Sequence, residues 1–245
     1  MLGAITVNHY DFNGRTALVT GAASGIGQAA AAALRSGGAR VAALDLRPAT
    51  STDLAIESDV SDHAAVRRAV DEVERTLGGI DVLVHAAGVG GPFRGLLELD
   101  DQEWRRIMAV NADGTFYVCR EVVPRMVDRG YGRVVLVSSI AGKDGNPLLP
   151  AYAASKAAMI AIAKSLGRSV AGTGVLINAI APAVVETPLA MAQTPEVVAQ
   201  MVSQVPLGRM GTPHEAAALI AWLASEDCSF STGAVYDLSG GRATW

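Results

Sequence analysis

The sequence has 245 residues, of which 50% are hydrophobic, and a formal net charge of −4. A chain of this length buries roughly 70–75% of the surface that it exposes when unfolded, so its two cysteines, Cys119 and Cys228, are expected to be buried thiols of a cytoplasmic protein rather than a disulfide. There is no basic stripe, the apolar runs fall short of the ~18–20 residues of a membrane span, and residues 1–12 lack a secretory signal pattern, so we expect no nucleic-acid partner and no membrane attachment.

Short β-branched runs alternate with longer helical stretches along the chain, and no linker or repeat divides it. The run Val134 to Val137 is apolar without interruption, which is typical of a strand covered by helices on both faces. Strands are expected at residues 15–20, 40–45, 54–58, 80–85, 133–138, 175–181 and 234–238. Helices are expected at residues 26–35, 64–77, 101–129, 153–171 and 215–224, with Ser61 or Asp62 capping the second and Thr212-Pro213 opening the last.

This alternation predicts an α/β fold. We expect residues 1–245 to form a single domain on one doubly wound, Rossmann-type parallel sheet of about seven strands, with helices on both faces. Ligands of such sheets bind at the carboxyl ends of the strands. The residues that follow each strand are therefore the candidates for a functional site.

A glycine-rich loop follows the first expected strand. Gly21, Ser24, Gly25, Ile26 and Gly27 lie between that strand and an alanine-rich helix. Glycine lets the backbone approach a pyrophosphate closely, and a helix N-terminus offers free N–H groups and a partial positive charge. In this position the loop predicts a dinucleotide site.

The second expected strand ends at an acidic residue, Asp45. A carboxylate there can accept hydrogen bonds from the adenosine ribose hydroxyls and repels a 2′-phosphate, which favours NAD over NADP. Arg47 leaves the preference open, because it is either a solvated loop charge or a partner for a 2′-phosphate.

Tyr152 and Lys156 lie four residues apart at the start of a helix and so share one face. A free phenol has a pKa of about 10, but a nearby cation stabilises the phenolate and lowers that pKa. Tyr152 can then act as the catalytic acid/base for an alcohol that loses a hydride to the cofactor. Ser139, at the end of a strand, can hydrogen-bond the substrate oxygen, although Ser138-Ser139 also suits a turn or helix cap.

With these motifs in place, the sequence resembles the short-chain dehydrogenase/reductase family from about residue 15 to residue 241. The motif Thr20-Gly21-x-x-x-Gly25-x-Gly27 is similar to the cofactor motif of that family. The resemblance implies that Ser139, Tyr152 and Lys156 are catalytic, and that Asn111 holds a water against the lysine in a proton relay. It implies a cofactor site formed by Gly21, Ser24, Gly25, Ile26, Gly27, Asp45, Asp59, Val60, Ala87, Gly88, Tyr152, Lys156, Pro182, Val185 and Thr187, with no metal.

The sequence departs from the family pattern at two positions. His85 stands where an asparagine is usual, and we interpret it either as a hydrogen-bonded structural histidine or as a titrating group. Ala183 stands where glycine is usual after the sixth strand. Because alanine at positive φ costs roughly 1–2 kcal/mol, we expect an ordinary backbone conformation there.

The substrate side of the site is less defined by the sequence. Residues 188–212 are expected to form a lid, whose Leu189, Met191, Met201, Val205 and Met210 serve either in packing or in recognition. Arg94, Lys143, Asp144 and Asn146 are the candidate polar contacts for the substrate, and Arg94 and Lys143 are also explained as surface charges on loops. Residues 141–147 and 237–245 are similar to family members that oxidise sugar acids and polyol-like compounds.

The family resemblance implies an NAD-dependent oxidoreductase that interconverts a secondary alcohol and a ketone. Two alternatives stay open: a reductase of 3-oxoacyl thioesters, which Asp45 disfavours, and a dinucleotide sensor without activity, which the presence of all four catalytic residues disfavours. The apolar faces of the 101–129 and Tyr152 helices predict a homotetramer, since relatives pair through these helices.

Overall fold

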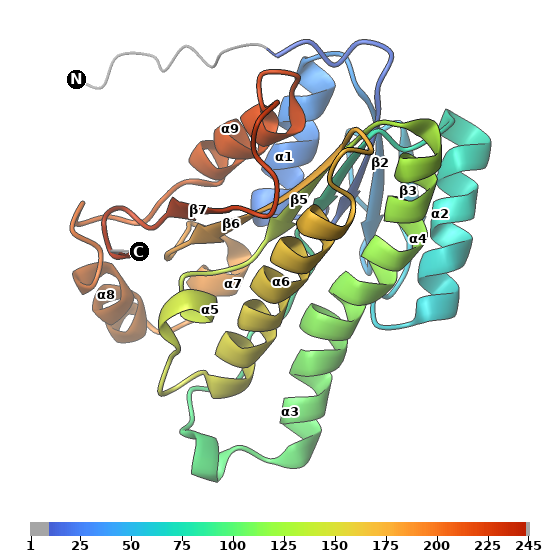
Figure 1. Ribbon diagram of the computed structural model, residues 1–245. Coiled ribbons are helices and arrows are strands. Elements are labelled where there is room, and N and C mark those ends of the chain that lie inside the picture. Colours follow the sequence, from blue (N-terminus) through green and yellow to red (C-terminus); the bar gives the residue numbers. More distant parts are fainter. Residues whose placement is uncertain (1–9, 244–245) are drawn as a thin grey trace.

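Parallel strands form the centre of the structure, a computed structural model that describes residues 10–243 (Figure 1). Within that range seven strands pair in the order β3-β2-β1-β4-β5-β6-β7. Their bounds are β1 Thr16–Thr20, β2 Arg40–Asp45, β3 Leu54–Glu57, β4 Val82–His85, β5 Gly132–Val137, β6 Val175–Pro182 and β7 Val235–Leu238. The order reverses at β1, whose neighbours β2 and β4 lie on its two sides, and this reversal is where a doubly wound sheet opens a crevice for a ligand.

Helices cover both faces of the sheet, as Figure 1 shows. The longer ones are α1 Gly25–Ser36, α2 His63–Leu77, α3 Asp101–Met108, α4 Gly114–Arg129, α6 Pro150–Ser169, α8 Pro195–Ser203 and α9 Pro213–Ala224. Shorter helical segments are the 3-10 helix Leu96–Glu98, the π-helical turn Ala109–Asp113, α5 Ala141–Asp144 and α7 Pro188–Met191. The predicted fold class, with strands and helices alternating around one parallel sheet, is confirmed.

The core consists of two apolar layers, one on each face of the sheet. Because side chains alternate along a strand, Leu18 packs with α2, α4 and α6, whereas its neighbours Ala17 and Val19 pack with α1 and α9. All three side chains are fully buried. Apolar strands buried on both faces thus hold the carboxyl ends of β1, β4, β5 and β6 in fixed positions.

The ends of two helices follow the sequence prediction. Asp62 caps α2 by accepting hydrogen bonds from the N–H groups of Ala64 and Ala65. At the start of α9, Thr212 and Glu215 form a reciprocal capping box. Among the helices of residues 10–243, none has the length and apolar character that crossing a membrane requires.

The prediction of a single helix over residues 101–129 is wrong in one respect. The helix is interrupted by the π-helical turn Ala109–Asp113, which separates α3 from α4 and carries Asn111. The Tyr152 helix begins earlier than predicted, at Pro150, because proline suits the first turn of a helix. The helical segments α5, α7 and α8 were not expected from the sequence.

Candidate active site

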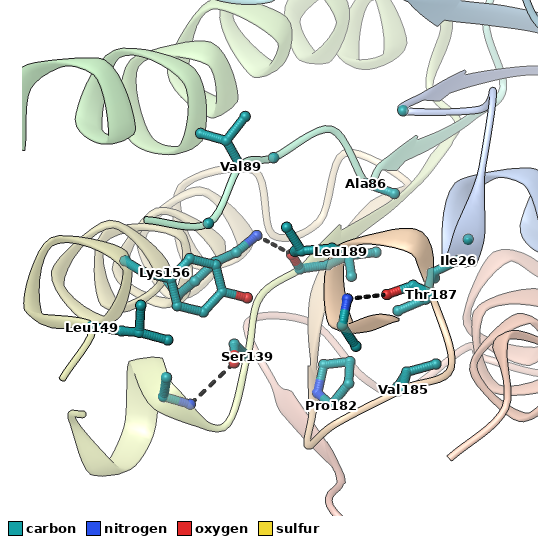
Figure 2. A pocket seen from close by; sticks show the side chains of 18 of the residues that line it. Ile26, Ala86, Val89, Ser139, Leu149, Lys156, Pro182, Val185, Thr187 and Leu189 are labelled. Atoms are coloured by element: carbon teal, nitrogen blue, oxygen red, sulfur yellow. Dashed lines mark hydrogen bonds between the residues drawn. The ribbon is translucent and has the colours of Figure 1, made fainter. Parts of the chain in front are cut away.

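A cleft of about 690 Å³ opens at the carboxyl ends of the strands. Its wall is formed by segments that follow each of the seven described strands, and Figure 2 shows side chains from several of them around one cavity. The residues that the sequence predicts for the cofactor all line this cleft: Gly21, Ser24, Gly25, Ile26, Gly27, Asp45, Asp59, Val60, Ala87, Gly88, Tyr152, Lys156, Pro182, Val185 and Thr187.

The loop after β1 requires glycines because neighbouring backbone lies too close for side chains. Gly21 has φ +68°, and a Cβ on it would lie 2.7 Å from the backbone nitrogen of Ala87. A Cβ on Gly27 would overlap the carbonyl group of Gly21. The loop therefore turns directly from β1 into α1, and the N-terminal end of α1 faces the cleft, where its N–H groups suit an anion such as a pyrophosphate.

Asp45 at the end of β2 holds the glycine loop from the other side. One carboxylate oxygen accepts a hydrogen bond from the Ala23 N–H at 3.0 Å, and the other accepts from the Arg47 N–H at 3.0 Å. The Arg47 side chain donates to the Ser24 hydroxyl at 3.0 Å, and its Nε lies 3.9 Å from the Asp45 carboxylate. Arg47 is thus held by Ser24 and Asp45, and the Asp45 carboxylate lines the cleft, where a ribose can reach it.

Tyr152 lies half-buried in the cleft beside Ser139. Burial raises the pKa of the phenol, and a hydrogen bond with Ser139 acts in the opposite direction. The Ser139 hydroxyl also accepts a hydrogen bond from the Ala141 N–H at 3.1 Å, two residues along the chain, as in a serine turn (Figure 2). Ser139 therefore combines the two interpretations that the sequence left open, since it closes the turn that leads into α5 and contacts the phenol.

The Lys156 ammonium lies 5.7 Å from the centroid of the Tyr152 ring, on the same face of α6. Its Nζ donates to the carbonyl oxygen of Val137 at 2.8 Å, drawn as a dashed line in Figure 2, and lies 3.3 Å from the Met159 sulfur. Burial lowers the pKa of Lys156 to about 8. The amine is thus held in place by α6 and β5 and remains largely charged near neutral pH.

Asn111 is fully buried behind the cleft and does not line it. Its side chain accepts from the Val89 N–H at 2.8 Å and donates to the Val89 carbonyl and to the Ser155 hydroxyl, both at 2.9 Å. A Cβ on Gly88 would lie 3.2 Å from the Asn111 amide oxygen and 3.3 Å from the Lys156 ammonium. The π-helical turn thus places the Asn111 amide beside Gly88, where the Lys156 ammonium of α6 also lies.

His85 is fully buried at the end of β4. Its Nδ1 lies 2.9 Å from the Thr20 hydroxyl, which in turn accepts from the Ala87 N–H at 3.2 Å, while Nε2 has no hydrogen-bond partner in the described residues. Burial, together with the charge of Lys156, lowers the pKa of His85 to about 3. The imidazole is therefore neutral, and the structure favours the structural interpretation of His85 over a titrating one.

The segment after β6 continues the cleft. Ala183 has negative φ, as expected, and its N–H donates to the Leu238 carbonyl at 3.2 Å. Thr187 caps α7 by accepting from the Ala190 N–H at 3.4 Å (Figure 2). The alanine in place of the usual glycine thus leaves the backbone path intact, and Thr187 is held at the edge of the cleft.

Of the four polar candidates for the substrate, one lines the cleft, and Asp144 is among those that do not. Asn146 does so, with its side-chain oxygen accepting from the Leu148 N–H at 2.9 Å. Arg94 is exposed on a loop and does not line the cleft. Lys143 also lies outside the lining, with its ammonium 3.9 Å from the Asp237 carboxylate.

Several lining residues were missed by the sequence interpretation. The apolar residues named for residues 188–212 divide in the structure: Leu189 and Met201 line the cleft, while Val205 is buried and Met191 is 61% exposed. Polar and charged side chains of the cleft that were not anticipated are Gln193, Gln200, Gln204 and Arg242. Gln200 and Gln204 lie four residues apart, at the end of α8, and this spacing was the available signal that they share a face.

Comparison with known proteins agrees with this geometry. Residues 21–243 match a family model described as enoyl-(acyl carrier protein) reductase. The 2-dehydro-3-deoxy-L-rhamnonate dehydrogenase (NAD(+)) of Sphingomonas sp. (strain SKA58) is 43% identical over 242 residues, covering 96% of this chain and 97% of that protein. The 3-oxoacyl-(acyl-carrier-protein) reductase FabG of Thermotoga maritima is 36% identical over 240 residues, covering 93% and 97%. A solved structure titled "Crystal structure of gox2181" has a TM-score of 0.91 and 31% identity, covering 96% of this chain and 98% of that one.

The family model and the relatives both extend over nearly the whole chain, and they cover the glycine loop, the serine, the tyrosine and the lysine alike. The resemblance drawn from the sequence motifs is therefore confirmed, and the chain belongs to the short-chain dehydrogenase/reductase family of oxidoreductases.

Proposed function

We propose that this protein is an NAD-dependent dehydrogenase that oxidises a secondary alcohol of a hydroxy acid with a polyol-like chain. The observation that carries the proposal is the single cleft in which an acidic residue, Asp45, follows β2 and the Ser139, Tyr152 and Lys156 side chains follow β5. The 43% identical relative supports the substrate class, because its name specifies both NAD(+) and a sugar acid.

The cofactor site is consistent with a dinucleotide in both shape and charge. The glycines at residues 21, 25 and 88 line the cleft, and a Cβ on any of them would come within 3.2 Å of neighbouring protein atoms. The N-terminus of α1 suits the pyrophosphate and the Asp45 carboxylate suits an unphosphorylated ribose. When bound there, NAD+ supplies the acceptor for the hydride.

The catalytic side chains divide the proton chemistry among them. In oxidation the Tyr152 phenolate accepts the proton of the substrate hydroxyl as a hydride leaves the carbon that bears this hydroxyl. In reduction the Tyr152 hydroxyl returns the proton to the substrate oxygen. Ser139 donates a hydrogen bond to the substrate oxygen, and Lys156 stabilises the phenolate by its charge. Asn111, beside Gly88, extends the proton path from Lys156 through a water.

We further propose that residues 188–212 act as the lid of the cleft. This segment contains α7 and α8, and neither helix has a fully buried residue. Elements with few buried apolar contacts open at low free energy. The lid would then admit the substrate and exclude water once closed.

A symmetric homotetramer in the cytoplasm completes the proposal. Trp104 on α3 and Phe116 on α4 are 37% and 48% exposed, and Phe230, close to the edge strand β7, is fully exposed. Such apolar surface and an uncovered sheet edge are typical of contacts between identical subunits. The two free, buried cysteines are consistent with a reducing compartment.

The test is the appearance of NADH absorbance with a panel of substrates. The panel contains 2-dehydro-3-deoxy-L-rhamnonate, D-gluconate, 3-hydroxybutyrate and neutral secondary alcohols, each with NAD+ and with NADP+. We expect oxidation of at least one hydroxy acid with NAD+. Faster reduction of acetoacetyl-CoA with NADPH would instead favour the second candidate, a 3-oxoacyl thioester reductase, which the FabG relative supports. No turnover of any compound would support a sensor.

A further inference from the structure

Charged side chains of the cleft are unevenly distributed. Asp45, Arg47 and Asp59 lie at the end beside β2 and β3, and Lys156 lies at the catalytic centre. Among the described lining residues, the one remaining charged side chain is Arg242, in the segment that follows β7. Within residues 10–243 it therefore provides the only formal charge on the part of the wall away from the cofactor residues.

Within the described residues, the Arg242 side chain has one ion-pair partner, Asp144. It is 20% exposed, and its Nε lies 3.5 Å from the Asp144 carboxylate of α5. Within residues 10–243 its guanidinium donates no hydrogen bond. Since Asp144 approaches the Nε edge, the two terminal Nη groups keep their donors for another partner.

The position of Arg242 is defined by the fold. Its N–H donates to the Ser239 carbonyl at 3.4 Å, and the adjoining Gly240 carbonyl accepts from the Leu207 N–H at 3.1 Å. α5, which carries Asp144, begins two residues after Ser139. In Figure 1 the segment after β7 runs back towards α5 and α8, so the guanidinium stands on the wall of the cleft that also carries the catalytic serine.

We propose that Arg242 binds the carboxylate of the substrate through its terminal Nη groups while the reacting hydroxyl lies at Ser139 and Tyr152. A guanidinium fork matches a carboxylate in geometry and charge. Because Asp144 already offsets part of the positive charge, a monoanion fits this position better than a phosphate dianion. The amides of Gln193, Gln200 and Gln204 line the same cleft and suit the remaining hydroxyls. This inference rests on the proposed function and specifies which residue selects acids.

The test compares each acid with its neutral amide in the same preparation of enzyme. The probe pairs are 2-dehydro-3-deoxy-L-rhamnonate with its primary amide, and 3-hydroxybutyrate with 3-hydroxybutyramide. The wild type is expected to prefer the acid in kcat/KM, and Arg242→Gln to reduce the acid-to-amide ratio by about 10- to 100-fold, as for the loss of a hydrogen-bonded ion pair. Because the ratio is taken within one preparation, a lower fraction of folded protein cancels from it.

Two variants complete the design. Arg242→Lys keeps the charge and should restore part of the ratio, whereas Arg75→Gln removes an equivalent charge from the exposed face of α2 and should leave the ratio as in the wild type. Binding is measured independently by calorimetric titration of the acid into the NADH complex of Tyr152→Phe, with and without Arg242→Gln. An unchanged ratio in Arg242→Gln, or equal use of acid and amide by the wild type, overturns the role of Arg242 and leaves the dehydrogenase activity standing. Absence of turnover for every compound of the panel overturns the proposed function itself.

Discussion

The phenol of Tyr152 is protonated at neutral pH in the structure, because burial raises its pKa above the ordinary value and the Ser139 hydrogen bond only opposes that rise. In this state the residue is ready to donate a proton, as reduction requires. Oxidation requires the phenolate. The charge of Lys156 and that of the oxidised cofactor favour the phenolate, so the acid/base function depends on both.

We expect kcat for oxidation to rise with pH as Tyr152 ionises, and kcat for reduction to fall over the same range. Tyr152→Phe should lower kcat by orders of magnitude and leave NADH binding close to that of the wild type, since the hydroxyl acts in the chemical step. Rates against pH and NADH fluorescence titrations measure the two effects separately. Near-normal turnover by Tyr152→Phe would mean that another group moves the proton.

Asp45 should determine the choice of cofactor. Asp45→Ala removes the acceptor for the ribose hydroxyls and the charge that repels a 2′-phosphate. We therefore expect NADH binding to weaken by about 10- to 100-fold, and the difference in affinity between NADH and NADPH to become smaller. Asp45→Asn is the matched control, because its amide oxygen still accepts from the Ala23 N–H but carries no charge. Tighter binding of NADPH than NADH to the wild type would contradict this role and point to Arg47.

Sequence patterns located the residues that stand at fixed distances within one motif. The glycine loop and the Tyr152–Lys156 pair belong to this group, and all of them line the cleft. Arg242 could not be located in this way. It reaches the cleft only because β7 pairs with β6 and the chain then returns towards α5, a long-range arrangement that leaves no local pattern.

Among the secondary structure elements, those with buried faces were the ones that the sequence predicted. The strands and α1, α2, α4, α6 and α9 all contribute to the two core layers, and the periodicity of their apolar residues follows from that burial. α7 and α8 have no fully buried residue, and α8 was missed although its apolar residues Val197, Val198, Met201 and Val202 recur at helical spacing. The π-helical turn escaped detection because it keeps the helical composition and changes only the register.

The capping box at the start of α9 is expected to contribute measurable stability. Thr212→Ala removes the hydroxyl that accepts from the Glu215 N–H, and should lower the free energy of unfolding by about 1 kcal/mol. Thr194→Ala removes the corresponding cap of α8, where the bond is longer at 3.5 Å and no residue is fully buried, so a smaller loss is expected. Urea denaturation near neutral pH compares the variants, and a larger loss in Thr194→Ala would contradict the role assigned to α9.

For the molecule as a whole, the parallel sheet order brings the segments that follow all seven described strands to one edge. The alternation of strands and helices was sufficient to predict this arrangement, since crossovers in such folds have one hand and ligands bind at the carboxyl edge. Surfaces between subunits are less accessible to sequence reasoning, because the exposed Trp104 and Phe116 lie among charged residues without a period of their own.

We expect a mass of about four chains of 25.2 kDa in light scattering, maintained on dilution. Phe116→Glu places a charge on the exposed face of α4 and should shift the protein towards smaller species. Arg75→Glu changes the charge of an exposed position on α2, outside the helices expected to pair, and serves as the comparison. A mass near that of one chain at all concentrations would refute the tetramer.

The π-helical turn at Ala109–Asp113 makes this part of the chain more sensitive to changes in length than to changes in composition. Removing one residue from the turn would take away the extra residue that the wider π turn accommodates and leave ordinary α-helical spacing. Even where the deleted residue is Asp113, so that every apolar residue remains, the position of Asn111 relative to Val89 and Ser155 would change. Libraries of variants built on this scaffold should therefore keep Asn111 and the number of residues fixed, and vary only the other positions of the turn by substitution.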